Sequence, residues 1–169
     1  MNKININDNL NEIITRLKTG ALLTTSNNDD INTMSIAWGM VGIMWNKPIF
    51  IAYVRDSRYT KEILDAAKEF TINIPNDDTN RQIISICGTK SGRDIDKFKE
   101  CNLTKVKTNV INSYGIQELP LTLECKVLYK QRQIEFELPK EILDRFYNNL
   151  DSGNIHTAYY AEIVDAYII

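Results

Sequence analysis

Residues 49–61 read IFIAYVRDSRYTK, and they predict a strand over 49–54 followed directly by a helix over 58–68, with Ser57 as the N-cap. Three of the last seven side chains are cations, although a helix start already carries unpaired N–H groups and a partial positive charge. Such cations repel the helix end unless an anion joins them, and the hydroxyls of Ser57 and Thr60 can share the same small volume. The segment therefore predicts a site for a small anion, for which a phosphate is the best fit.

A purely structural role for these cations is the alternative. Arg55 and Arg58 can pair with Asp56 and Glu62 on a solvated surface, as charged clusters often do. The two hydroxyl residues beside the cations bring the two interpretations level, and the pattern alone leaves both open.

Composition bounds the class of protein. The 169 residues are 43% hydrophobic and 25% charged, which is typical of a globular chain that buries a core, so we expect a single domain over residues 1–169. A net charge of −2 gives no basic face for nucleic acid. No apolar run approaches the roughly 20 residues that span a bilayer, and the N-terminus lacks the apolar stretch of a signal peptide. We therefore expect no nucleic acid or membrane partner and a cytoplasmic location.

Few residues offer metal or nucleophile chemistry. Cys87, Cys101 and Cys125 are widely spaced without a CxxC pair, so neither a zinc site nor a dithiol motif is indicated and we expect reduced thiols. His156 is the only histidine, which argues against most metal sites and catalytic triads. We expect no metal and no catalytic side chain of the triad type.

Alternating apolar patterns predict further strands on both sides of the opening segment. The expected strands cover 20–25, 33–39, 49–54, 70–74, 121–129, 133–138 and 157–164. Short helices are expected over 58–68, 80–86, 94–101 and 140–147, with Asp94 capping the third and Pro139 in the first turn of the last. Strands separated by short helices rather than by regular βαβ units favour a β-dominated α+β domain, an antiparallel barrel with peripheral helices.

Two further segments have unusual content. In residues 32–38, NTMSIAW, either Met34 and Trp38 face a core, or the strand offers its backbone groups and the Ser35 hydroxyl to a flat heteroaromatic ring. The apolar residues 40–45 that follow also suit subunit association. In residues 87–98, CGTKSGRDIDKF, two glycines allow a ligand to approach the backbone closely. This loop is neither a Walker loop nor a GxGxxG dinucleotide motif.

Together these segments resemble the flavin reductase-like family of FMN-binding split barrels, which includes the flavoredoxins. The family's N-x-M-[ST]-x-x-W strand, V-R-x-S-R-Y-T turn and C-G-x-x-S-G-R-D-x-D-K-F loop correspond, in order, to residues 32–38, 54–60 and 87–98. Residues 153–164 are similar to the family's terminal G-D-x-H…G-E-V strand. The likeness covers most of the chain from Gly20 onward.

The chain departs from the family pattern at a few positions. Asp56 stands where a proline is frequent, and it adds a negative charge near the proposed phosphate. Asn154 replaces a common acid, and Ala161 replaces the usual glycine of the terminal strand. None of these changes removes an expected cofactor contact.

The resemblance implies a six-stranded antiparallel split β-barrel with Greek-key connections and short peripheral helices. It also implies a homodimer that binds FMN at each subunit boundary, with the phosphate held in the 55–61 turn and the ring along the 32–38 strand. His156 is expected either on the substrate side of the ring or as a buried structural histidine. The expected FMN contacts are Asn32, Thr33, Met34, Ser35, Ile36, Ala37, Trp38, Arg55, Ser57, Arg58, Tyr59, Thr60, Gly88, Ser91, Gly92 and Lys97.

The implied activity is that of an NAD(P)H-dependent flavin reductase. Such an enzyme takes hydride from NADH or NADPH onto the flavin and passes electrons to free flavin, a redox partner protein or another acceptor. Because the flavin performs the chemistry, the absence of a triad is no obstacle. Two alternatives remain open: a flavoredoxin-type FMN electron carrier without its own nicotinamide substrate, and a haem or small-ligand binder of the same architecture.

Overall fold

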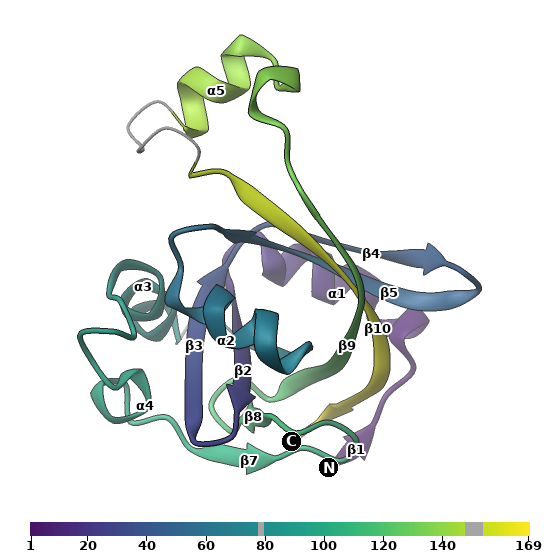
Figure 1. The fold of residues 1–169 in the computed structure, drawn as a ribbon. Helices are drawn as coiled ribbons and strands as arrows, with labels where there is room; N and C mark the ends of the chain where they lie inside the picture. Colours follow the sequence, from purple (N-terminus) through teal and green to yellow (C-terminus); the bar gives the residue numbers. More distant parts are fainter. Residues whose placement is uncertain (78–79, 148–153) are drawn as a thin grey trace.

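The fold is that of a computed structural model, which describes residues 1–77, 80–147 and 154–169 (Figure 1). Gly153, at the start of the closing motif, lies outside the described residues. Within these ranges no helix has both the length and the apolar composition needed to cross a bilayer. The cysteines are free thiols, as expected, and two of them are buried.

One antiparallel sheet of eight strands organises the molecule (Figure 1). Its order is β3-β2-β6-β9-β10-β5-β4, and β1 pairs with the far end of β10. The strands are β1 (Asn2–Lys3), β2 (Ala21–Asn27), β3 (Asp30–Ile36), β4 (Gly39–Met44), β5 (Lys47–Arg55), β6 (Glu69–Ile74), β9 (Leu121–Arg132) and β10 (His156–Ile168). A separate ribbon joins β7 (Lys105–Lys107) to β8 (Tyr114–Ile116).

The expected count of six barrel strands is therefore wrong for the main sheet. The predicted strand over 33–39 ends at Ile36, and the chain resumes as β4 at Gly39. The apolar stretch that follows forms a hairpin with β5, whose turn places Trp45 and Asn46 at positive φ. The six-residue strand β4 thus comes from a segment for which sequence analysis predicted no strand beyond Gly39.

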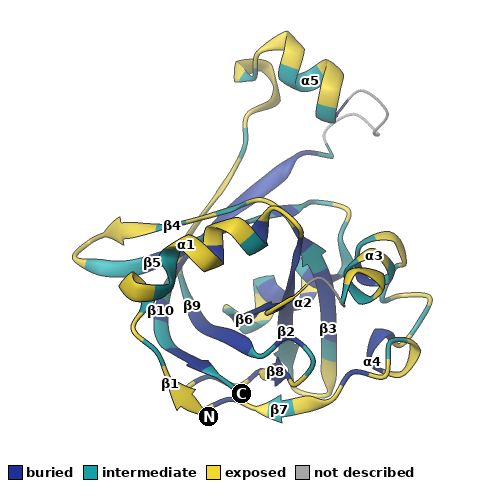
Figure 2. Cartoon of the chain, turned by 180° about the vertical axis from the view of Figure 1, so that it is seen from behind, coloured by how far each residue is buried: buried dark blue, intermediate teal, exposed yellow. Residues whose placement is uncertain are grey.

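Apolar side chains from alternating strand positions fill the barrel. Phe50 and Phe70 meet edge to face, with ring centroids 6.5 Å apart. Helix α1 (Ile6–Leu17), which sequence analysis did not predict, buries Ile13 and Leu17 in the same core and leaves its outer face exposed (Figure 2). Burial of that apolar stripe holds α1 against the barrel.

The remaining helices lie at the periphery. They are α2 (Tyr59–Ala67), α3 (Arg81–Thr89), α4 (Lys97–Glu100) and α5 (Lys140–Phe146). Helix α2 packs on β2 and β3, while α3 packs mainly on β3 (Figure 1). These contacts bring the β5–α2 turn, the α3–α4 loop and β3 together at one edge of the barrel.

Two predicted caps are wrong. The N-cap of α2 is Arg58, whose side chain makes no capping hydrogen bond, while the N–H of Ser57 donates to Asn154 Oδ1 at 3.1 Å. Helix α4 is capped by Asp96, whose carboxylate accepts from two N–H groups of the first turn. Asp94 instead closes a turn onto the carbonyl of Ser91, so the helix begins later than its sequence suggests.

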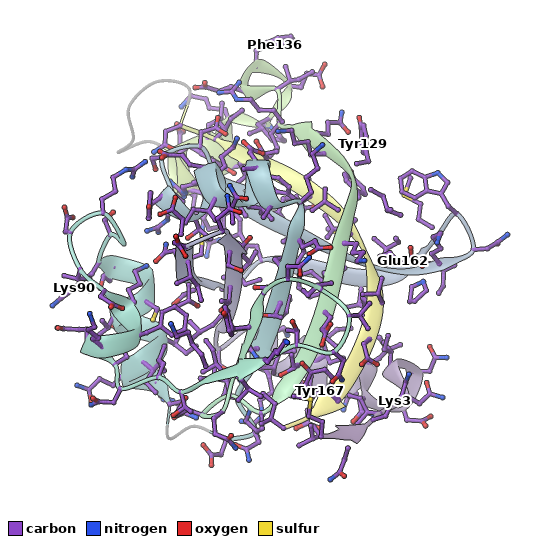
Figure 3. The ribbon with its side chains drawn as sticks, turned by 60° about the horizontal axis from the view of Figure 1, so that its bottom comes forward. Lys3, Lys90, Tyr129, Phe136, Glu162 and Tyr167 are labelled. Atoms are coloured by element: carbon purple, nitrogen blue, oxygen red, sulfur yellow. The ribbon has the colours of Figure 1, made fainter. Side chains whose placement is uncertain are left out.

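The outer half of β9 leaves the barrel and leads into an excursion, residues 128–147, which we call the arm (Figure 1). The arm carries a 3₁₀ turn (Glu135–Glu137) and α5, so the expected strand over 133–138 is wrong. The N–H of Gln133 still donates to the carbonyl of His156, but the chain then turns away from β10. Phe136, 86% exposed, lies at the tip of the arm (Figure 3).

Candidate functional site

Two adjoining cavities lie where β3 leaves the sheet beside the β5–α2 turn. The first, of about 160 Å³, is lined by Met34, Ser35, Ile36, Ala37, Trp38, Tyr53, Arg55, Arg58 and His156. The second, of about 100 Å³, is lined by Asn32, Met34, Ser57, Arg58, Tyr59, Thr60, Thr89, Lys90, Ser91, Gly92 and Lys97. Because Met34 and Arg58 line both, the two cavities adjoin along these side chains.

The three segments singled out in the sequence therefore meet, and all the expected contact residues except Thr33 and Gly88 line one cavity or the other. The hydroxyl of Thr33 turns into the barrel, where it bonds to Thr24 and to the carbonyl of Leu23. Gly88 packs against β3: a Cβ there would stand 3.2 Å from the Ser35 side chain. Both positions contribute backbone carbonyls to the site rather than side chains.

Arg58 and Lys97 carry positive charge into the second cavity without a carboxylate partner. Lys97 is 3% exposed, and its Nζ donates to the carbonyls of Thr33 and Cys87 at 2.9 and 2.8 Å. Arg58 donates to the carbonyl of Gly88 at 2.9 Å. In the described part of the chain neither cation forms an ion pair.

The electrostatics of these two cations favour an anionic ligand. Burial lowers the pKa of Lys97, and burial together with repulsion from Arg55 lowers the pKa of Arg58. A buried charge held only by neutral carbonyls is costly unless a counter-charge joins it. A ligand bearing negative charge would supply that missing counter-charge.

The neighbouring carboxylates are paired elsewhere. Asp56 accepts from Arg132 Nε at 2.6 Å and lines neither cavity. Glu62 pairs with Arg93 on the surface. The alternative in which the two arginines of the turn pair with these carboxylates is therefore wrong, and the negative charge of Asp56 is directed away from the second cavity.

Buried hydrogen bonds define the shape of the second cavity. Asn32 Nδ2 donates to Thr60 Oγ1 at 2.8 Å, and both residues are buried. A Cβ at Gly92 would overlap the Asn32 amide, so the loop can approach β3 this closely only with a glycine there. The N-terminus of α2 meets the cavity at Tyr59 and Thr60, where the first N–H groups of a helix lack helical partners and suit an anion.

The first cavity has aromatic and thioether walls. Trp38 is 39% exposed and lies edge to face with Phe146, with centroids 5.2 Å apart, and 4.9 Å from the His156 ring. Arg55 lines this cavity rather than the second, and it donates to the carbonyl of Phe146 at 3.0 Å. The hydroxyl of Ser35 donates to the carbonyl of Ile84, which leaves its lone pairs for a ligand. Such walls suit a flat heteroaromatic ring.

Sequence analysis missed several residues of the site. Tyr53 lines the first cavity, and its position two residues before Arg55 on β5 would have placed it on the same strand face. Thr89 and Lys90 lie inside the loop already singled out. Phe146 and Tyr147 come from the arm, and no local pattern signals them because their position depends on long-range packing.

Known proteins match both the sequence and the fold. The model of the flavin reductase like domain matches residues 14–169, whereas no curated protein sequence matches. The flavoredoxin of Desulfovibrio vulgaris is 23% identical with a TM-score of 0.67, and 89% of this chain aligns with 68% of that one. An FMN-binding domain of a flavin reductases-like enzyme from Shewanella baltica is 17% identical with a TM-score of 0.64, over 92% and 72% of the chains.

A third solved structure is an NADH:FAD oxidoreductase of Streptomyces globisporus. It is 13% identical with a TM-score of 0.65, and all of this chain (100%) aligns with 87% of that one. At these identities the likeness concerns the fold, and it confirms the expected class of a β-dominated split barrel with short helices.

Proposed function

Since this chain belongs to the flavin reductase-like domain family, we propose that it is an FMN-dependent oxidoreductase that takes hydride from NADH or NADPH and passes electrons to an acceptor. The observation that carries the proposal is the pair of cations in the second cavity, buried Lys97 and half-buried Arg58, which have no carboxylate partner in the described part of the chain and lie beside the aromatic walls of the first cavity. FMN has a phosphate dianion at one end and a flat ring at the other, so its two ends match the two cavities.

The second cavity would hold the phosphate. Arg58 and Lys97 neutralise its charge, the N-terminus of α2 faces it, and the Ser57 and Ser91 side chains border it. Because both cations are already fixed by backbone carbonyls, they need little reordering when an anion arrives.

The first cavity would hold the ring along residues 35–38. When bound, FMN supplies the group that accepts and donates hydride. Met34 and Trp38 provide polarizable contact area, and the backbone of the β3–β4 connection offers hydrogen-bonding groups to the polar edge of the ring. Arg55 keeps positive charge beside this cavity, and His156 lines the side next to the arm.

An electron carrier without its own nicotinamide substrate is the second candidate, because the flavoredoxin fold matches this chain over most of its length. The reductant of a reductase, NAD(P)H, suits the cytoplasmic location expected from the sequence. Free flavin or a redox partner protein would receive the electrons. FAD is the alternative flavin, by analogy with the Streptomyces oxidoreductase.

The proposal is tested on the purified protein by its visible spectrum, followed by NAD(P)H oxidation with added FMN, FAD or riboflavin. A flavin spectrum with turnover supports the reductase. A flavin protein that NAD(P)H does not reduce supports the carrier. A haem spectrum, or no affinity for any flavin, refutes both.

The proposal includes a homodimer, with the flavin at each subunit boundary. It is supported by exposed apolar side chains on the β4–β5 hairpin and on the arm, including Ile43 at 74% and Phe136 at 86% exposure. Exposed apolar groups on two projecting elements are typical of association surfaces. Light scattering on the holoprotein measures its oligomeric state. Ile43→Lys should shift the equilibrium from dimer toward monomer. A wild-type protein that is monomeric with flavin bound would contradict the proposed dimer.

A further inference from the structure

His156, the only histidine of the chain, is tied to the arm by a short series of hydrogen bonds. Its Nδ1 lies 2.7 Å from the hydroxyl oxygen of Tyr147. That hydroxyl lies 3.0 Å from Gln133 Oε1, which also accepts from the backbone N–H of His156 at 3.3 Å. All three residues thus form one network between the start of β10 and the arm.

The donors in this network can be assigned from chemistry alone. A backbone N–H can only donate, so the Gln133 atom that faces it is the carbonyl oxygen. Tyr147 reaches that same oxygen, and its single hydroxyl proton must point there. The oxygen of Tyr147 can then only accept from the histidine, which places the imidazole proton on Nδ1.

The other ring nitrogen is left for the cavity. In the described part of the chain Nε2 has no hydrogen-bond partner, and it is not among the fully buried unpaired atoms. His156 lines the first cavity, and its ring centroid lies 4.9 Å from that of Trp38. A nitrogen without a proton presents only a lone pair there.

We propose that Tyr147 and Gln133 are positioning residues that hold His156 in its Nδ1–H form, so that Nε2 selects a ligand group that donates a hydrogen bond. This rests on the proposed function and deepens it. The carboxamide N–H of a dihydronicotinamide is such a donor, whereas a group with only acceptor atoms is disfavoured at this point. The arm thereby takes part in choosing the electron donor.

The charges around the ring keep this acceptor from becoming a donor. Arg55 and Arg58 face the ring from β5 and the β5–α2 turn, and the carboxylate of Asp56 has Arg132 as its partner. Burial, with these two arginines, lowers the pKa of His156 to about 4. The imidazole therefore stays neutral at physiological pH, and the proton assignment is the same throughout the working range of the protein.

Further contacts bind the same end of the arm to the cavity. Phe146 packs on Trp38 and accepts from Arg55 through its carbonyl, and the Arg55 guanidinium lies 5.2 Å from the centre of the Tyr147 ring. The hydroxyl that fixes His156 is thus carried by a segment docked on the cavity wall. A displaced arm would lose the wall and the proton assignment together.

Nitrogen NMR of protein labelled with ¹⁵N-histidine tests the assignment directly, because a single histidine gives an unambiguous pair of ring signals. In wild-type apoprotein at pH 7 we expect Nδ1 protonated and Nε2 unprotonated. Tyr147→Phe should yield a mixture of both forms. Gln133→Leu frees the Tyr147 hydroxyl to donate to Nδ1, so the Nε2–H form should appear. Tyr129→Phe, the same hydroxyl deletion on exposed β9, should match wild type.

Steady-state kinetics test whether the positioned His156 helps to select the electron donor. Tyr147→Phe should raise the KM for NAD(P)H about fivefold, the size of one neutral hydrogen bond, with a smaller change in kcat and none in Tyr129→Phe. A protonated Nε2 in the wild-type protein overturns the inference, as does an unchanged KM when the ring protons have shifted. The NMR measurement needs no turnover and is independent of the proposed function. If the protein shows the expected tautomer but does not oxidise NAD(P)H, the proposed function and the substrate selection are refuted, while the positioning role of Tyr147 and Gln133 stands.

Discussion

Replacing Arg58 with methionine is the sharpest test of the anion site. Arg58 lines both cavities, and among the described residues its guanidinium donates to the carbonyl of Gly88. Methionine keeps much of the side-chain length and apolar stem but removes the charge. If the second cavity binds a phosphate, the variant should bind FMN more weakly and yet remain folded.

The magnitude follows from the contact that is lost. A hydrogen bond to a charged group contributes roughly 1.5–3 kcal/mol, which corresponds to an FMN affinity about ten- to 150-fold lower. The free energy of unfolding of the apoprotein should change little, by about 1 kcal/mol or less. The apoprotein loses the bond to Gly88, but it is also relieved of a half-buried cation whose pKa is lowered by burial and by repulsion from Arg55.

A comparison of riboflavin with FMN separates the contribution of the phosphate to binding from that of the ring. Riboflavin shares the ring of FMN but lacks the phosphate, so the difference between the losses of FMN and riboflavin affinity isolates the coupling of Arg58 to the phosphate. Titration by fluorescence quenching should give a riboflavin loss of about threefold or less. Arg16→Met serves as the control, since Arg16 also donates to a carbonyl, that of Asn76, but lines neither cavity. Equal losses for both ligands, or unchanged FMN affinity in the folded variant, would refute the phosphate assignment.

Three further predictions follow from the same contacts. Asp56→Asn should leave FMN affinity within about twofold, because Asp56 lines neither cavity; a large gain in a titration would show that its charge opposes the phosphate. Gly92→Ala should weaken FMN retention on gel filtration, because the added methyl group overlaps the Asn32 amide, whereas Gly42→Ala, with open space around it, should behave as wild type. Burial is the main reason why the pKa of His156 is lowered from 6.5 to about 4, so the unfolded chain takes up this proton first as pH falls. The free energy of unfolding of the apoprotein, measured by urea titration, should therefore fall by up to about 3 kcal/mol between pH 6.5 and 4. His156→Gln should lack that part of the loss.

The segments that line the two cavities were predictable from sequence where their patterns are local. The motif residues lie close together in sequence in each of three segments, 32–38, 54–60 and 87–98. A strand, a turn and a loop could therefore be identified without knowing how they pack. Even the failed cap at Ser57 shifted the start of α2 by only a residue. Boundaries of this kind depend on one or two backbone dihedrals, which side-chain patterns do not specify.

The missed parts depend on distant partners. Helix α1 carries apolar residues on one face, but the alternation at the very start of the chain hid that period. The strand predicted over 133–138 does not form, because the pairing of β9 with β10 ends at Arg132 opposite Thr157, a residue far along the chain. The hydrogen bonds that join Gln133, Tyr147 and His156 have no local sequence pattern, because the three side chains come from separate segments of the chain.

The placement of Asp56 explains how the chain tolerates its departure from the family pattern. A carboxylate beside Arg58 would neutralise the cation and compete with an incoming anion. Here the turn after β5 sends the Asp56 side chain toward β9 and β10, where it accepts from Arg132 of β9 and from the Thr157 hydroxyl of β10 at 3.1 Å. Arg58 is left with a neutral carbonyl as its partner. Carbonyls fix a cation in position without cancelling its charge, so this arrangement stays attractive to an anion, and the acidic residue at the turn secures the base of the arm instead.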